Sequence, residues 1–192
     1  MSYIASTIAG YFIERSNKEE RQLSVLQIIK LVYISHGWNL ALNDAPLISD
    51  RIEAWTYGPV IPSLKSFFEG KGLRKDDLVS LSVEEVNCIK FEHLELLNKV
   101  YVKYEQITGE ELSQLMHEDD TPWFAVWDNE RGRNNPIENE ATKAYYSKQI
   151  NKEIFDALPK IPAITTKEKA EVFLKKAGIL MENGEINPIY IN

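Results

Sequence analysis

The hydrophobic and polar positions along the chain recur mostly with the spacing of α-helices. Apolar residues three and four positions apart predict an amphipathic helix that starts near Ile4. The segment 23–42 is apolar on nearly every side, and a helix of that kind belongs in the middle of a domain. Further helices are predicted over 61–68 with its start at Pro62, over 86–101 behind a capping box at 82–85, from a second capping box at 108–111, and over 137–158.

The segment between the first buried helix and Pro62 breaks the helical pattern. Alternation across Ile52, Ala54 and Thr56 predicts a short strand pair. Gly58 and Pro59 are expected to end the strand and to set the direction of the chain into the next helix. The predicted fold class is therefore mainly α with a minor β part, a compact helical domain around a buried central helix.

The end of the chain has a different pattern from the rest. Pro159 and Pro162 mark a joint, a capping box at 165–168 precedes a short helix, and Asn183-Gly184 lies between two apolar runs as in a β-hairpin. We expect a helical domain over 1–157 and a helix-and-hairpin appendage over 158–192. An exposed hairpin edge can extend the sheet of a partner, and packing as a simple appendage is the alternative.

Composition and charge exclude several classes of protein. The formal net charge of −7 opposes binding to nucleic acid, since Lys and Arg form no basic run. The single cysteine, Cys88, cannot form an internal disulfide, and its place in the predicted helix 86–101 indicates a small buried side chain. The N-terminus does not have the pattern of a signal peptide, and polar residues interrupt the segment 23–42. We expect a cytoplasmic protein without membrane contact.

Catalytic candidates are few and scattered. The three histidines, His36, His93 and His117, fall on separate predicted elements, whereas metal sites usually group their ligands. His36 is expected to be a buried neutral histidine with a hydrogen-bond partner. A metal-dependent hydrolase built on His36 and His117 with Glu118 or Asp119 stays open as an alternative. The usual nucleotide-binding, hydrolase and zinc-protease motifs do not occur, so we expect no enzyme and no catalytic, cofactor-binding or metal-binding residues.

Three blocks with aromatic residues next to Gly or Pro have a more specific pattern. They are "LQIIKLVYISHGWNLAL" at 26–42, "EAWTYGPVIPSL" at 53–64 and "LSQLMHEDDTPWFAVW" at 112–127. In this order they resemble the signature blocks of the Panacea domain family, which includes SocA-like antitoxins and GepA-like proteins of phages and mobile elements. The family-motif positions, with a structural or partner-binding role, are Lys30, Tyr33, His36, Gly37, Trp38, Trp55, Tyr57, Gly58, Pro59, Pro122 and Trp123.

The resemblance implies a mostly helical antitoxin that neutralises a cognate toxin, encoded by an adjacent gene, by direct protein–protein binding. It also implies an alternative, because a member of this family acts as an adaptor that delivers its toxin to a protease. No catalytic residue and no cofactor are implied. Trp55 and Tyr57 are expected to anchor their segment to the helix 23–42, and the appendage, over 166–192, to add toxin contacts. The pattern leaves a homo-oligomer open.

Overall fold

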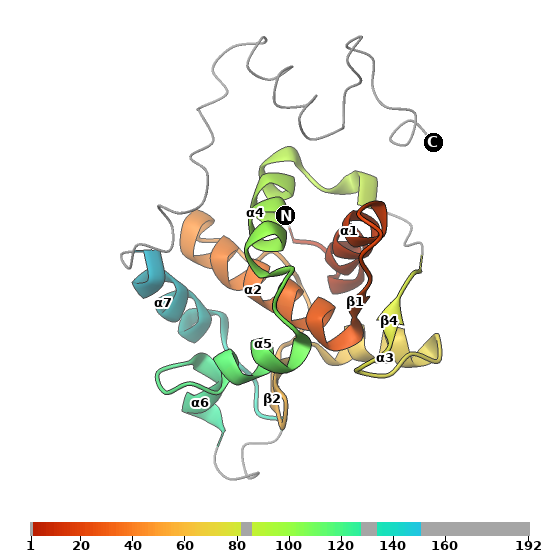
Figure 1. Cartoon of the computed structure of the whole chain (residues 1–192). Coiled ribbons are helices and arrows are strands. Elements are labelled where there is room, and N and C mark those ends of the chain that lie inside the picture. Colours follow the sequence, from red (N-terminus) through yellow and green to blue (C-terminus); the bar gives the residue numbers. More distant parts are fainter. Residues whose placement is uncertain (1, 82–85, 128–133, 151–192) are drawn as a thin grey trace, which may run out of the picture. The chain divides into compact units, whose positions relative to one another are not determined.

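The computed structural model describes residues 2–81, 86–127 and 134–150 (Figure 1). These residues are mainly helical, with two small antiparallel strand pairs, as the pattern predicts. None of the described helices is long and apolar enough to cross a membrane. The helices are α1 (Ala5–Lys18), α2 (Val25–Asn43), α3 (Pro62–Gly70), α4 (Phe91–Tyr104), α5 (Gly109–Met116), α6 (Pro122–Val126) and α7 (Asn139–Ile150), and the strands are β1 (Leu23–Ser24), β2 (Glu53–Trp55), β3 (Gly58–Val60) and β4 (Leu78–Val79).

Helix α2 is the centre around which the other helices pack. It contacts α1, α3, α4, α5 and α7, and Figure 1 shows it running through the middle of the bundle. Most of its side chains are buried on every side, so the predicted buried central helix is confirmed. The helix begins two residues later than Leu23, because the Ser24 side chain and Gln27 form a capping box. Asp44 ends it in the left-handed conformation, with φ 53°.

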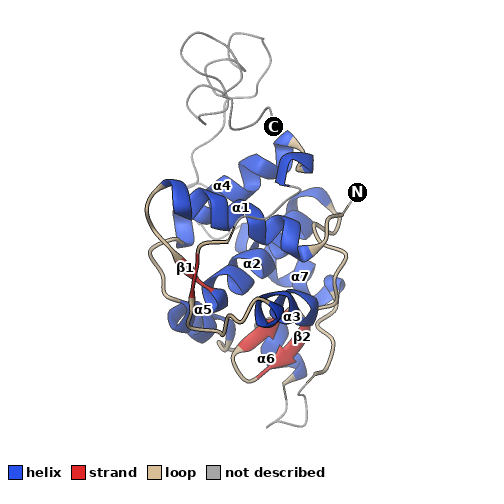
Figure 2. Cartoon of the chain, turned by 90° about the vertical axis from the view of Figure 1, so that its right-hand side faces the viewer, coloured by secondary structure: helices blue, strands red, loops and turns tan. Residues whose placement is uncertain are grey.

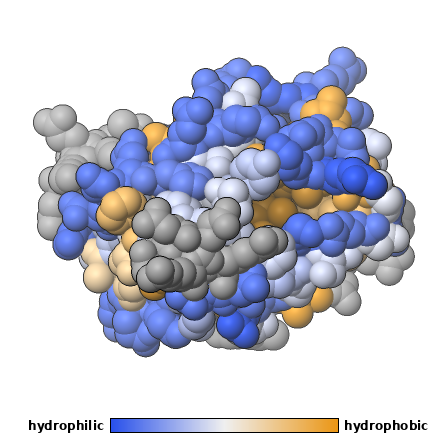
Figure 3. Space-filling model, turned by 90° about the horizontal axis from the view of Figure 1, so that it is seen from below, coloured by the Kyte–Doolittle hydropathy of each residue, from blue (hydrophilic) through white to orange (hydrophobic). Residues whose placement is uncertain are grey.

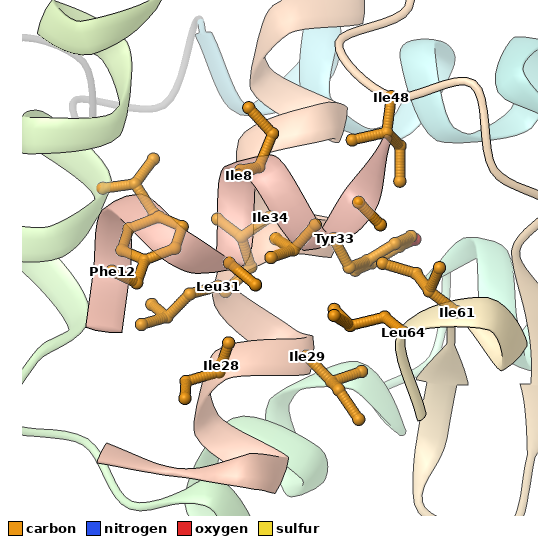
Figure 4. Packing of buried hydrophobic residues seen from close by; sticks show 14 of the residues in the cluster. Ile8, Phe12, Ile28, Ile29, Leu31, Tyr33, Ile34, Ile48, Ile61 and Leu64 are labelled. Carbon is orange, nitrogen blue, oxygen red and sulfur yellow. The ribbon is translucent and has the colours of Figure 1, made fainter. Parts of the chain in front are cut away.

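The hydrophobic core surrounds α2 (Figure 4). Helix α1 contributes Ile8 and Phe12, and α3 contributes Leu64, all fully or almost fully buried. Each such side chain stabilises the fold by about 1.5–3 kcal/mol relative to an exposed position. This burial explains why a chain with short, weak strands still forms one well-defined set of helices.

The strands form two separate pairs (Figure 2). β2 pairs with β3 in the register Glu53↔Val60 and Trp55↔Gly58, which confirms the predicted strand pair. Gly58 and Pro59 open β3 and do not end a strand, which corrects our expectation. The pairing of β1 with β4, Leu23↔Val79, was not predicted, because two-residue strands have too little alternation to recognise.

The prediction of a helix from residue 86 is wrong. Val86–Cys88 forms a 3₁₀ turn, and α4 begins only at Phe91, after Lys90 adopts an extended conformation. The reason is a contact from the N-terminus, because the Tyr3 hydroxyl accepts a hydrogen bond from the Lys90 backbone N–H at 2.9 Å. Cys88 is therefore exposed and not buried as expected.

The predicted starts of two helices are confirmed, because α3 begins at Pro62 and α5 carries its capping box at Thr108. The first helix starts one residue after Ile4, which precedes α1 and is 52% exposed. The described part of the predicted helix 137–158 is α7. The boundary at 157 and the appendage over 158–192 lie outside the described residues.

Helix α7 packs on α2 through a glycine. A Cβ atom built on Gly37 would lie 2.1 Å from Cε2 of Tyr146, far inside van der Waals contact. Tyr146 is buried and also meets the rings of Tyr33 and Trp38 edge-on, at centroid distances of 6.3 and 5.2 Å. Gly37 is therefore the position that lets α7 approach α2 closely.

Replacing Gly37→Ala is expected to destabilise the fold by about 2–3 kcal/mol, because overpacking of Tyr146 outweighs the better helix propensity of alanine. Urea unfolding followed by circular dichroism measures the change. Gly70→Ala in α3 is the matched control, since nothing lies within 4 Å of its added Cβ. Equal stability of the two variants would contradict the close approach of α7.

Candidate protein-binding site

The residues of the three sequence blocks form two groups at different positions along α2. One group surrounds the β2–β3 turn and includes Lys30, Tyr57 and Trp123. The other lies against α7 and includes His36, Gly37 and Trp38. The structure therefore does not bring all family-motif positions into one site.

Lys30 is the link between α2 and the β2–β3 turn. Its Nζ donates hydrogen bonds to the backbone carbonyl oxygens of Tyr57 and Pro59, the latter at 2.9 Å. The side chain is 1% exposed, and burial lowers the pKa of its amino group to about 7. Removing a cation from water is costly, so these two carbonyl acceptors are the interactions that make its position tenable.

Gly58 is required at the turn for two reasons. Its φ of 89° lies in the region that favours glycine, and an added Cβ would come within 2.8 Å of Lys30 Nζ. The ammonium group thus occupies the space that any other residue's side chain would need. Lys30 and Gly58 are complementary parts of one contact.

Helices α5 and α6 hold the same turn from its other side. Ser113 Oγ donates to the carbonyl of Tyr57 at 2.8 Å, and Trp123 Nε1 donates to the carbonyl of Trp55 at 2.8 Å. His117 Nε2 lies 3.0 Å from the carbonyl oxygen of Thr56. Side chains from three helices therefore reach the backbone carbonyl oxygens of the turn and of the strand ends beside it. We call this set of hydrogen bonds the turn clasp.

Aromatic stacking supports the clasp. The ring centroid of Trp123 lies 4.0 Å from that of His117, and the Trp123 ring stacks on Trp127 with a centroid distance of 5.0 Å. Trp123 is buried, and Thr121 caps α6 directly before Pro122 by accepting a hydrogen bond from the Phe124 N–H. The start of α6 at Pro122 thus places the Trp123 indole against the β2–β3 turn.

The clasp presents the side chain of Tyr57 to solvent. Tyr57 is 54% exposed, contrary to our expectation that it anchors the segment, and only its backbone carbonyl is buried in hydrogen bonds. Lys75 Nζ lies 4.4 Å from the centroid of its ring. Trp55 is half-buried and donates from Nε1 to Glu53 at 2.9 Å.

Two more large apolar side chains are exposed on the helices that hold the turn. Phe124 of α6 is 49% exposed and Leu115 of α5 is 38% exposed. Figure 3, which views the molecule from below, shows apolar areas on this face among hydrophilic surface. Partly exposed aromatic side chains on a rigid support are typical of protein-binding surfaces.

His36 connects α2 to α7 and to the loop before β2 through hydrogen bonds. Its Nδ1 accepts a hydrogen bond from the Ile48 N–H at 3.3 Å, so Nε2 carries the proton and donates to Asn139 Oδ1 at 2.8 Å. Burial lowers the pKa of His36, against the smaller opposing effect of Asn139. A buried neutral histidine with hydrogen-bond partners is what the pattern predicted.

The hydrolase alternative gains no support from these positions. His117 directs both ring nitrogens at backbone carbonyl oxygens, those of Ser113 and Thr56, and His36 uses both of its nitrogens elsewhere. The partners of the two rings have no residue in common. Across 2–81, 86–127 and 134–150, no three His, Cys, Asp or Glu side chains gather as metal ligands.

Comparison with known proteins assigns the chain to a family. The sequence model described as "Antitoxin SocA-like, Panacea domain" matches residues 28–124, a span that contains the second sequence block and most of the first and third. The chain belongs to this family. It is similar to antitoxin SocA of Caulobacter vibrioides, with 24% identity over 130 residues that cover 64% of this chain and 69% of that protein. No solved structure matches the chain.

Sequence reasoning missed the roles of several residues that complete the two groups, and it named His117 only as a hydrolase candidate. Ser113 and His117 hold the turn, and Asn139 and Tyr146 contact the C-terminal half of α2. The first two lie within the third sequence block, where their spacing of four on one helix was the available signal. Asn139 and Tyr146 lie beyond the matched residues 28–124, and no local pattern marks them.

Replacing Gly58→Ala is expected to cost more stability than Gly72→Ala. Both glycines have positive φ, 89° and 78°, so both variants carry backbone strain of about 1–2 kcal/mol. Only Gly58 has the Lys30 ammonium in the way, whereas nothing lies within 4 Å at Gly72. Chemical unfolding of the two variants measures the difference, and equal losses would show that Lys30 does not occupy that space.

Lys30 also predicts a pH dependence of stability. Its pKa is about 7 in the folded chain and near 10.4 when unfolded, so the unfolded state binds more protons between these values. The free energy of unfolding should therefore rise from pH 7 to pH 9, by as much as about 2 kcal/mol. Lys30→Met should remove this rise, while Lys71→Met, at an exposed position, should keep it.

Urea midpoints at pH 7, 8 and 9 measure this effect. The range stays below the titration of the buried tyrosines, whose raised pKa values change stability only at higher pH. Parallel profiles for the wild type and Lys30→Met would contradict the buried amine.

Proposed function

We propose that this protein neutralises a cognate toxin by binding it directly. Membership of the SocA-like antitoxin family supports this proposal, and the toxin is expected to be encoded by an adjacent gene. The observation that carries it is the turn clasp. Side chains from the first and third sequence blocks hold the backbone of a turn in the second block, while the Tyr57 ring is left exposed.

A turn held in this way suits protein recognition. A rigid loop loses little conformational freedom on binding, so an exposed aromatic side chain on it contributes more of its contact energy to affinity. Tyrosine adds a large apolar ring and one polar group, which is why it is common among residues that dominate interfaces. Phe124 and Leu115, on the helices of the clasp, extend the apolar area available to the toxin.

The net charge fits the same proposal. At −7 the chain attracts a basic partner over a distance, which raises the rate of association more than the final affinity. Toxin binding by this protein should accordingly slow as salt is added. Net charge therefore acts on the rate of association, while specificity depends on local contacts such as those of the aromatic surface.

The first test is a growth assay with the adjacent gene. That gene alone should stop growth, and co-expression of this chain should restore it through a complex that survives purification. If the adjacent gene does not stop growth and no complex forms with its product, the proposed toxin partner is absent and the proposal is contradicted. Toxin levels in the same cells separate two mechanisms, since masking leaves the toxin abundant whereas delivery to a protease depletes it.

Tyr57→Ala is expected to weaken toxin binding at least tenfold, about 1.4 kcal/mol, without unfolding the protein. The clasp uses the backbone carbonyl of Tyr57, so loss of the ring leaves the turn in place. Isothermal titration calorimetry measures the affinity. Ile4→Ala is the control, because Ile4 is 52% exposed and lies outside the clasp. Equal affinities for the two variants would exclude Tyr57 from the interface.

A further inference from the structure

A second candidate surface lies between the C-terminal half of α2 and helix α4. Here a pocket of about 220 Å³ is lined by Trp38 and Leu42 of α2 and by Leu96 and Tyr104 of α4. The Trp38 side chain hydrogen-bonds Tyr104, which ties the two walls together. We call this pocket the α2–α4 groove. In both Figure 1 and Figure 2, helix α4 and strand β2 lie on opposite ends of the described part of the molecule. The groove is therefore separate from the surface around Tyr57.

The groove contains two charged groups of opposite sign whose buried atoms lack hydrogen bonds. Glu95 Oε1 and Lys103 Nζ are shielded from solvent, and neither has a hydrogen-bond partner among the described residues. Burial raises the pKa of Glu95, against the smaller opposing effect of Lys99 in the same groove, and lowers the pKa of Lys103. The interaction found for Lys103 is the ring of Tyr104, with Nζ 5.3 Å from its centroid. Each unsatisfied group destabilises the free protein.

The spacing of Glu95 and Lys103 indicates which groups a ligand must present to pair with them. Glu95 and Lys103 are eight residues apart on α4, so their backbones are separated by two turns, about 12 Å. A matching ligand presents a cation toward Glu95, an anion toward Lys103 and an apolar group between them. A nucleic-acid backbone or an anionic lipid surface presents charge of one sign and does not match. A folded protein segment with mixed side chains does.

The size of the pocket sets what enters it. A volume of about 220 Å³ is below that of common small-molecule sites, which begin at roughly 300 Å³, and it suits one large side chain. An aromatic or long aliphatic side chain would lie in the pocket against Leu42, Leu96 and Tyr104. Interfaces commonly anchor one such residue in a pocket bordered by charged groups. A second copy of this chain is disfavoured, since two copies each carry −7.

We propose that the α2–α4 groove is a second toxin contact, which receives an apolar side chain of the toxin flanked by a basic group that pairs with Glu95 and an acidic group that pairs with Lys103. This inference rests on the proposed function. It adds to it a contact remote from Tyr57, so that one toxin meets two separate surfaces of the antitoxin. Effects of changes at two such distant surfaces should combine additively in the free energy of binding.

The test uses the full chain with its toxin and two variants of nearly unchanged shape, Glu95→Gln and Lys103→Met. In the free protein each variant should raise the melting temperature, by about 2 °C or more, because a buried charged atom without a hydrogen bond is removed. In the complex each should weaken toxin binding at least tenfold. Glu20→Gln, at an exposed position after α1 and outside the groove, is the matched control and should change neither quantity.

The outcomes separate this inference from the function on which it rests. Wild-type protein that binds no toxin removes both. Toxin affinity that falls for Tyr57→Ala but is unchanged for Glu95→Gln and Lys103→Met overturns the groove contact alone. A lower melting temperature for the free variants would show that the two charges already have partners in the free protein, which also overturns it. Light scattering completes the set, because a dimer that dissociates on Glu95→Gln would make a second copy the occupant.

Discussion

The hydrogen bonds from Lys30 to the β2–β3 turn are the interaction on which the rest of the structure depends. α2 is buried on every side, so a lysine in its middle has no route to solvent. Its amino group must be satisfied inside the protein, and the carbonyl oxygens of Tyr57 and Pro59 do this. The same contact holds Pro59, three residues before α3 begins at Pro62. A charged residue in the middle of α2 thus ties this helix to the segment that leads into α3.

Sequence patterns predicted the elements that depend on local or strongly apolar signals. α2 followed from its all-round hydrophobicity, α3 from Pro62 and α5 from its capping box at Thr108. The patterns failed where a contact between residues far apart in the sequence sets the start of a helix. Tyr3 meets Lys90, eighty-seven residues away, and shifts the start of α4, and no local pattern contains that information. The capping box at Ser24 was present in the sequence and would have placed the start of α2 correctly.

The candidate site shows the same division. Residue types in the three blocks identified the family and the important positions, but their roles are set by the tertiary structure. Tyr57 was expected to be an anchor because aromatic residues near Gly and Pro are often buried. In the structure its backbone carbonyl is the anchor and its ring is exposed, since the carbonyl receives Lys30 and Ser113. Only the packing of three helices around one turn separates these two roles.

The contacts of the C-terminal half of α2 explain why the family-motif positions extend beyond one surface. Gly37 and His36 contact Tyr146 and Asn139 of α7, which lies after the matched residues 28–124. The glycine and histidine of the first block therefore pack against a helix that the family match does not include. Trp38 connects these contacts to the α2–α4 groove, because its ring meets that of Tyr146 and also lines the pocket. If the groove binds a toxin side chain as we propose, that side chain would lie beside the aromatic cluster that holds α7, and binding would then be coupled to the packing of α7 through the indole ring of Trp38.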